Sequence, residues 1–536
     1  MENDKKYTKD SKTGNWTKNK SNKNKGRNKN KGGKPYQESD NSDLKGKTPG
    51  RNDTRWWGKG SLFKDVASFS YPTASGRSMM LADSSSVLIK NKQPKVTFPG
   101  IMELDMMPLP GTVGTWSDPA NVMLRKVYSF IRHANSGSKN YDAADLGIYF
   151  MCYDNAVSFY AYMVRAYGTL RTLLLQNRYT PDDLVTVMGC DYNDLIAHMS
   201  VFRSYINTYA IRLNALKIPN SMHFVERHLW LYSNIFMDAP NNKAQLYVFK
   251  PAAFWEYVDG ETPETTYFAP KEVVPSRASN QELYTFERLR VIGERMLNYV
   301  LNSEDFNIMS GDIIKAYGDN LFALSLISED YTVTPVYEPE VLLMLHNATD
   351  FYSPVLNSGT TDIHIFTNWR IHQDYSESTN VGALVGDFDI PMHNKAGNIV
   401  AGSGAINAAL RHLLDVPVLS PEPVVNVEAT RMMVHCEPHV EAAADDKSFY
   451  LTPTAYGTEI LIGRVIWTKD AKTGQLGAYK PITNKFRDLD RMFSVTTFYW
   501  DVSLAWDGTD KSVNITSYSI GGSIDNVTTI TGDELG

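Results

Sequence analysis

Apolar residues recur at helical spacing through the middle of the chain. From Asp142 they follow one another every three or four positions, which predicts a long helix that ends near Asn177. The run Ser117–Pro119 combines a capping residue with proline at the first helical position and predicts a helix to about His133. We also predict helices from Thr180–Pro181, at 192–216, at 219–237, from a capping box at Ser279–Glu282 through Val300, and at 303–316, 338–346 and 405–415.

Strand-like patterns lie between and after these helices. Segments 245–258 and 361–372 show partial alternation and many aromatic residues. From about residue 423, four runs favour strands: VVNVEATRMMV, EILIGRVIW, FSVTTFYWDVSLAW and SVNITSYSI. No segment of about 20–50 residues recurs, which argues against a solenoid or a propeller. The pattern predicts an α+β protein that is predominantly α-helical, with a strand-rich C-terminal part.

The net charge of −6 conceals an unequal distribution along the chain. The first 60 residues hold 17 Lys and Arg against 7 Asp and Glu, a net charge of +10. The remaining 476 residues hold 37 against 53, a net charge of −16. This asymmetry indicates a basic interaction tail joined to an acidic body.

The tail has the composition of a disordered polycation. Residues 18–34 read KNKSNKNKGRNKNKGGK, and no Val, Ile, Leu or Phe precedes Leu44, so the tail cannot bury enough apolar surface to fold. Its expected partner is RNA, bound through phosphates without sequence preference. The predicted RNA-binding residues are Lys18, Lys20, Lys23, Lys25, Arg27, Lys29, Lys31 and Lys34. A solubilising tail, a nuclear localisation signal and a membrane-binding segment are the alternatives.

The rest of the composition indicates an ordinary globular body. Hydrophobic residues make up 42% of the chain and aromatic residues 12%, enough for large cores. No apolar run is long enough to span a membrane, and the N-terminus has no apolar segment typical of a secretion signal. The three cysteines, Cys152, Cys190 and Cys436, are too few for a disulfide framework. We predict a reduced, soluble protein of the cell interior. Trp56 and Trp57 either anchor the tail to the body or stack on bases.

Candidate catalytic and metal-binding motifs are weak. Residues 397–403 match GxxxxG but lack the lysine of a phosphate-binding loop, and 318–320 (Gly-Asp-Asn) match one polymerase tripeptide without a second carboxylate site. The cluster 435–439 places two histidines and a cysteine together, but Pro438 is expected to break a strand there. Asp387, Asp389 and His393 could hold a hard cation. We predict that the protein is not an enzyme and has no catalytic residues, no cofactor and no metal site. A triad assembled from distant residues stays open.

Tail and body together resemble a viral capsid protein, and more narrowly the coat proteins of the picobirnaviruses, which have small segmented double-stranded RNA genomes. The resemblance extends over nearly the whole chain. The segments that carry it are the arm KNKSNKNKGRNKNKGGK, the junction RWWGKGSLFKD and the helical stretch YDAADLGIYFMCYDNAVSFYAYMVRAYGTLRTLLLQNRY.

This resemblance implies an icosahedral shell built from intertwined dimers of an α-helical subunit that exchanges N-terminal segments. The Pro-containing stretch 62–118 fits such an exchange. We expect a disordered basic arm and linker at 1–60, a shell domain at 61–240 and 405–536, the latter with β-strands, and a smaller projecting domain at 241–404. The implied partners are other copies of the chain, viral RNA and the viral polymerase inside the particle. The implied location is the virion, assembled in the host cytoplasm, and the host receptor or membrane stays undetermined.

Two other classes of protein are alternatives. A cytoplasmic RNA-binding protein of ribonucleoprotein particles, which is not a capsid protein, would carry the same arm but form no shells. An enzyme with a basic tail would need a pocket of convergent titratable groups, which the sequence does not reveal.

Overall fold

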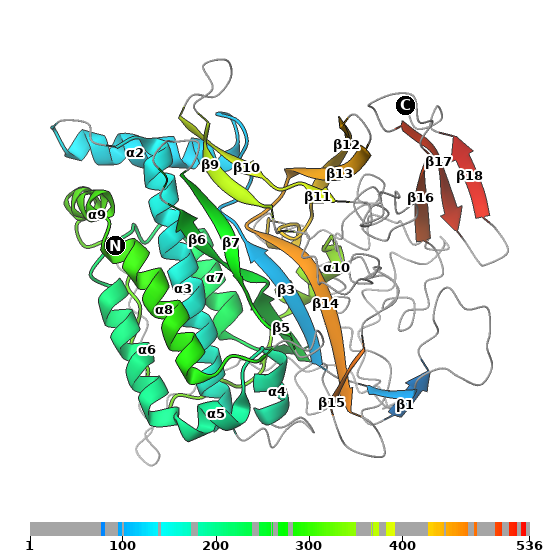
Figure 1. Ribbon diagram of the computed structural model, residues 1–536, viewed down its shortest axis with the longest axis horizontal. Coiled ribbons are helices and arrows are strands. Elements are labelled where there is room, and N and C mark those ends of the chain that lie inside the picture. The colour runs from blue at the N-terminus through cyan, green and yellow to red at the C-terminus, as the bar shows by residue number, and fades with distance from the viewer. Residues whose placement is uncertain are drawn as a thin grey trace, which may run out of the picture. The chain divides into compact units, whose positions relative to one another are not determined.

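The protein was examined as a computed structural model. It describes residues 77–80, 95–98, 101–137, 141–172, 181–237, 246–258, 260, 266–276, 282–349, 366, 368–374, 382–391, 427–443, 446–469, 476–479, 499–505, 514–521 and 527–531. The chain divides into two units, Met1–Asp53 and Thr54–Gly536, and all described residues belong to the second. Helix and strand are mixed in it, as the sequence predicts (Figure 1). None of the helices in these ranges is long and apolar enough to cross a membrane.

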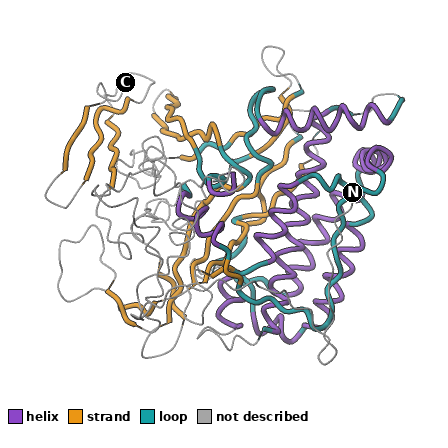
Figure 2. The backbone as a smooth tube through the Cα atoms, turned by 180° about the vertical axis from the view of Figure 1, so that it is seen from behind, coloured by secondary structure: helices purple, strands orange, loops and turns teal. Residues whose placement is uncertain are grey.

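Most helices of the described ranges belong to the first half of the chain. They are α2 (Pro119–Ala134), α3 (Ala143–Arg171), α4 (Pro181–Val187), α5 (Tyr192–Ala197), α6 (Met199–Leu213), α7 (His223–Ser233), α8 (Phe286–Leu301), α9 (Glu304–Tyr317) and α10 (Pro339–Asn347). Figure 2 shows α3, α6 and α8 as a layer of helices beside the strands. The prediction of an α-helical first part is confirmed.

Helix α3 is the centre of this layer. Asp142 caps it, accepting hydrogen bonds from two backbone amides of the first turn, and every residue from Leu146 through Leu170 is buried. A helix that is buried on all sides needs no polar face, so apolar residues occur all round α3, and its buried polar residues, such as Asp154 and Asn155, have hydrogen-bond partners inside the protein. It ends at Arg171, six residues before the predicted end, where the Thr172 hydroxyl donates to the carbonyl of Gly168.

A six-stranded sheet joins segments far apart in the sequence. Its order is β15 (Leu476–Tyr479), β14 (Glu459–Lys469), β3 (Ile101–Pro108), β5 (Leu246–Pro251), β4 (Phe236–Met237) and β8 (Val336–Tyr337). Strand β3 pairs antiparallel with β14 and parallel with β5, and the two central strands β3 and β5 are almost wholly buried. Burial on both faces explains why they are rich in apolar residues, while the charges that they carry, Glu103, Asp105 and Lys250, pair with one another.

Four smaller sheets complete the described strands. One has the order β10 (Ala383–Asp387), β9 (Arg370–Asp374), β7 (Tyr267–Val273), β6 (Ala253–Val258). A second has the order β11 (Ile390–Pro391), β13 (Asp446–Ala455), β12 (His435–Ala443). The others are β1 (Arg77–Met80) with β2 (Lys95–Phe98), and β16 (Tyr499–Ala505), β17 (Asn514–Gly521), β18 (Val527–Thr531). The prediction of a strand-rich C-terminal part is confirmed.

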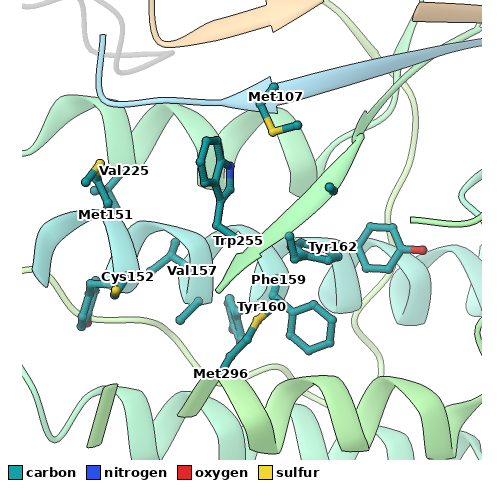
Figure 3. Close-up of a cluster of buried hydrophobic side chains, with 14 of the residues drawn as sticks. Met107, Met151, Cys152, Val157, Phe159, Tyr160, Tyr162, Val225, Trp255 and Met296 are labelled. Carbon is teal, nitrogen blue, oxygen red and sulfur yellow. The ribbon is translucent and has the colours of Figure 1, made fainter. Parts of the chain in front are cut away.

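The main hydrophobic core lies between α3 and the strands packed against it. Figure 3 shows Trp255 of β6 on one side of Val157 and Phe159 of α3, and Met296 of α8 on the opposite side of these two residues. The side chain of Asn155 on α3 pairs with the backbone of Trp255, donating to its carbonyl over 2.7 Å and accepting from its amide over 2.9 Å. These two bonds fix the register of α3 against the sheet edge.

Several predicted boundaries are wrong. Helix α8 begins at Phe286, capped by Thr285, and not at the Ser279–Glu282 box, of which only Glu282 is described. The cause is tertiary: the amide of Tyr284 donates to the carbonyl of Gly189 over 2.8 Å, and the carbonyl of Tyr284 accepts from a neighbouring strand-like segment. This pairing holds the chain extended up to the cap. The helix at 405–415 lies outside the described residues.

Two further segments differ from the prediction through their neighbours. The predicted helix 192–216 is divided at His198 into α5 and α6, and 219–237 ends in the short strand β4. Pro438 lies inside β12 opposite Leu451 and does not break it. Strand β12 is at the edge of its sheet, where a missing amide hydrogen is tolerated.

The apolar run 424–434 was the least accurate strand prediction. Its described part begins with a helical turn at 427–429, and strand β12 starts only at His435. The predicted strand at 361–372 is found as β9, of which only residues 370–372 fall in that range. In both cases the strand begins where backbone partners become available.

Candidate functional site: buried charge networks and an uncharged helix face

The predicted RNA-binding residues all precede residue 35 and lie outside the described residues, so their role stays a prediction. Trp56, Trp57, His393 and the GxxxxG segment at 397–403 also lie outside them. The site that the structure can describe therefore belongs to the acidic body.

The weak metal and polymerase motifs have ordinary structural roles. Gly318 ends α9 in a left-handed conformation, with φ +58°, so the Gly-Asp-Asn tripeptide is a helix terminus. Asp387 receives hydrogen bonds from Arg370 over 2.6 Å and His372 over 3.2 Å, and these partners lower the pKa of Asp387. Asp389 accepts from Thr452. Among the residues described, no three His, Cys, Asp or Glu side chains are placed to hold a metal ion.

The three cysteines are in environments that make their thiols unreactive. His435 is exposed and bonds to Thr454, whereas Cys436 beside it is buried. Cys152 and Cys190 are also buried and none of the three is in a disulfide. Burial raises the pKa of all three thiols, that of Cys190 to about 12. A neutral, buried thiol is a poor nucleophile and a poor metal ligand.

The first buried charge network joins α7, α3 and β14. Arg227 donates through Nε to Oε1 of Glu459 over 2.7 Å, and its guanidinium also pairs with Glu428. His228 lies beside it, with Nδ1 2.8 Å from Oδ2 of Asp154 and Nε2 3.4 Å from Oε1 of Glu459. The network ties three elements that are distant in the sequence, and it leaves its charges paired with one another.

The protonation states in this network follow from that pairing. Burial alone would lower the pKa of His228, but Asp154 and Glu459 raise it to about 10. Burial alone would raise the pKa of Glu459, but Arg227 and His228 bring it well below its usual range. A cationic imidazole between two carboxylates cannot accept a proton at neutral pH, so it is unsuited to general base catalysis.

The second network lies at the centre of the six-stranded sheet. Lys250 of β5 pairs with Glu103 of β3 and lies 3.1 Å from Oδ1 of Asp105. Trp467 of β14 donates through Nε1 to the other oxygen of Glu103 over 2.6 Å. Burial alone would lower the pKa of Lys250, but Asp105 and Glu103 raise it, so the ammonium stays charged. These contacts join the three adjacent strands of the sheet.

Sequence reasoning missed both networks. Their members are up to 364 residues apart, and neither spacing nor composition connects them. The local signals are charged residues inside largely apolar segments, namely Glu103 and Asp105 in IMELDMMP and Lys250 in LYVFKP. Such buried polar residues hold elements together in a chosen arrangement and are not catalytic by their presence alone.

The surface offers a different feature, an uncharged face on α6. The exposed positions of this helix and the turn after it are Ser200, Val201, Ser204, Thr208, Ile211 and Ala215. Exposed helix positions are ordinarily occupied by charged residues, which makes their absence in a body of net charge −16 informative. Ile211 is 59% exposed and Val201 is 56% exposed.

The described body thus pairs its buried charges internally and presents aliphatic side chains of α6 to solvent, without a catalytic group among these residues. Comparisons with known proteins give the family. A family model described as Picobirnavirus, Capsid protein matches residues 56–489. The chain belongs to the picobirnavirus capsid protein family.

Two relatives agree with this assignment. The capsid protein precursor of human picobirnavirus (strain Human/Thailand/Hy005102/-) is 28% identical over 424 residues, covering 77% of this chain and 74% of the relative. The crystal structure of the picobirnavirus capsid superposes with a TM-score of 0.63 at 19% identity, covering 90% of this chain and 95% of that one. The second comparison establishes the fold, and the prediction of a mixed helical and strand architecture is confirmed.

Proposed function

We propose that the chain assembles as dimers into an icosahedral shell that encloses an RNA genome, with the basic arm binding that RNA without sequence preference. Membership of a capsid family supports the shell. The observation that carries the role of the arm is the charge distribution, +10 in residues 1–60 against −16 in the remainder. An acidic body repels RNA, so a cationic arm is the part of the chain suited to retain it.

The arm experiment replaces Lys18, Lys20, Lys23, Lys25, Arg27, Lys29, Lys31 and Lys34 with Gln in the full chain. Particles are purified, treated with nuclease and compared by the ratio of absorbance at 260 and 280 nm and by extracted RNA. We expect shells of normal appearance with much less RNA. The matched control replaces the seven lysines with Arg and should package normally, because charge and not side-chain identity acts.

Equal RNA content in the wild-type and Gln particles would contradict the packaging role and favour a solubilising tail. A chain that binds RNA but forms no particles in electron micrographs would favour the cytoplasmic non-capsid RNA-binding protein instead. The separated arm should bind duplex RNA with a salt slope that approaches about −0.9 per phosphate neutralised, or about −0.7 on single strands.

We further propose that the folded body is sufficient for assembly, so that the arm is not required for it. The body supplies the buried apolar surface of the structure, and the described residues hold no part of the arm. A chain beginning near residue 48 should therefore form closed particles by electron microscopy. Recovery of that chain only as soluble monomer, under conditions where the full chain assembles, would contradict this.

The division into a shell domain at 61–240 and 405–536 and a projecting domain at 241–404 stays a proposal. It is supported by the acidic, loop-rich stretches 256–264 and 328–340 within the interval. Strand β5 and helix α8, which belong to this interval, pack with α3 in the common core, so they would form the base of any projection. A density map of the assembled particle tests the boundaries directly. We also propose, on family resemblance alone, that the viral polymerase is enclosed in the particle and that assembly takes place in the host cytoplasm.

A further inference from the structure

The uncharged face of α6 is continued by a segment that packs along the helix. Asn207 donates to the carbonyl of Ile327 over 3.0 Å and accepts from its amide over 2.9 Å. Seven residues further along α6, about two helical turns, Asn214 makes the same pair of bonds with Leu324, at 2.9 and 2.8 Å. We call residues 322–327 the strap. Four hydrogen bonds hold it antiparallel to α6.

The strap carries a second large apolar side chain that is exposed, Leu326. On a helix, Ile211 is four residues from Asn207 and three from Asn214, so it lies on the side that the strap follows. Leu326 is on the strap between the two anchored residues, and it is 56% exposed. Ile211 and Leu326 are therefore exposed apolar side chains on two segments that these four hydrogen bonds hold together.

This region is exceptional within the described residues. The four most exposed large apolar side chains there are Ile211, Val201, Leu326 and Val427, at 59, 56, 56 and 55%. Three of these four belong to α6 and the strap. A concentration of exposed aliphatic side chains marks an interaction surface, whereas isolated ones are ordinary.

Charged residues lie around this face: Arg203 and Arg212 of α6 are partly exposed, and Glu329 and Asp330, which follow the strap, are exposed and pair with Arg171. Arg212 on α6 pairs with Glu294 of α8 over 2.7 Å. Arg290 and Glu287 pair on α8 over 2.6 Å, and Tyr205 of α6 donates to the carbonyl of Arg290. An apolar centre without charge and a rim of polar groups is the anatomy of a protein interface. Figure 1 shows that α6 and α8 lie on the side of α3 away from β3 and β14, where the sheet does not cover them.

We infer that the uncharged face of α6, with Leu326, is a contact surface between two copies of this chain, in which α6 meets α6 across a two-fold axis. This inference rests on the proposed assembly into a shell. A copy of an acidic body can approach another copy only where charge is absent or balanced. Across a two-fold axis each group faces its own equivalent, so a charge near the axis would meet a like charge. A face of aliphatic and hydroxyl side chains meets that requirement, and RNA, which needs cations, does not fit it.

The contact is the centre of a larger interface. A standard interface buries about 800 Å² on each partner, more than one helix of about 22 Å can supply. We therefore assign the remainder to α8 and the strap. The hydrogen bonds of Asn207 and Asn214 hold the strap in its place before association, which lowers the ordering cost of binding.

The first test introduces charge at the centre of the face. Ile211→Asp and Leu326→Asp place like charges opposite one another across the axis, and Val427→Asp is the control at an equally exposed apolar residue outside the region. With folding checked by circular dichroism, we expect the first two variants to lose particles at least tenfold and the control to assemble normally. Unchanged particle yield in folded Ile211→Asp would overturn the inference while leaving the shell itself established. Absence of particles from the wild-type chain would instead contradict the proposed function.

The second test does not depend on a disruptive substitution. All three native cysteines are buried, so Ile211→Cys introduces one reactive thiol among the described residues. We expect this thiol to resist maleimide in intact particles, to react in dissociated subunits, and to form a cross-linked dimer with a short bifunctional maleimide. Labelling at equal rates in both states would overturn the contact. Protection that disappears when the packaged RNA is digested, while particles stay closed, would assign the face to RNA and also overturn it.

Discussion

Nε of Arg227 lies 2.7 Å from Oε1 of Glu459, a carboxylate 232 residues further along the chain. This bond connects α7 to β14, and both groups are buried. It shows how the body holds distant segments together: a charge on a helix is paired with a charge on a strand that comes much later in the sequence. Lys250 and Glu103 join two strands, β5 and β3, in the same way.

Removing one member of the first network should strongly destabilise the fold. Glu459→Gln leaves Arg227 and His228 buried with a partner lost, and we expect the free energy of unfolding to fall by about 3–5 kcal/mol. The matched control is Glu287→Gln, which breaks the exposed pair with Arg290 and should change stability little. Urea unfolding of dissociated subunits, followed by tryptophan fluorescence, measures both. A loss below about 1 kcal/mol for Glu459→Gln would show that the network contributes little.

His228 should make stability fall as pH rises. Its pKa is raised from 6.5 to about 10 in the folded state, so the protonated imidazole stabilises the fold fully below pH 6.5 and progressively less above it. Glu459, whose pKa is lowered, stays ionised at pH 6 and above and contributes no change there. Between pH 6 and 9, the contribution of His228 should decrease by about 3 kcal/mol.

The measurement compares wild-type subunits with the His228→Gln variant at both pH values. The difference between their free energies of unfolding reports His228 together with its effect on the paired carboxylates of Asp154 and Glu459. We expect that difference to be larger at pH 6 than at pH 9. An identical difference at both pH values would mean that folding does not shift the pKa of His228.

The second network offers a rescue experiment. Lys250→Met leaves the buried carboxylate of Glu103 and the half-buried carboxylate of Asp105 without their cation and should cost about 3–5 kcal/mol. Adding Glu103→Gln removes one uncompensated charge while keeping an acceptor for the Trp467 indole. The double variant should therefore be more stable than Lys250→Met alone, by thermal unfolding at pH 7. A double variant that is less stable would show that Glu103 is not held mainly by Lys250.

Two glycines should respond in opposite ways to alanine. Gly189 has φ +88°, and a Cβ there would overlap the carbonyl oxygen of Pro275, so Gly189→Ala should destabilise by more than about 1 kcal/mol. Gly311 lies within α9 with open space around it, so Gly311→Ala should stabilise by about 0.5–1 kcal/mol. Thermal unfolding of dissociated subunits measures both. Equal shifts for the two variants would exclude a conformational role for Gly189.

The sequence determined by itself the features that depend on neighbouring residues. The Ser117–Pro119 signal predicted the start of α2, because proline at the first turn replaces an amide that has no helical partner. Helix α9 begins at Glu304 after the cap Ser303, and α10 begins at Pro339, each within one residue of the predicted starts at 303 and 338. Overall sequence character was also sufficient for the capsid family, which the family model confirms over 56–489.

Only the tertiary structure decided what depends on distant partners. The Ser279–Glu282 box satisfies every local rule for a helix start, yet the bonds of Tyr284 to the segment at Gly189 delay α8 until Thr285. The pairing of Arg227 with Glu459 and the bonds of Asn207 to Ile327 leave no trace in local spacing. The physical reason is the same in each case: a hydrogen bond or a buried charge pair depends on separation in space, and hundreds of residues of chain can lie between its two ends.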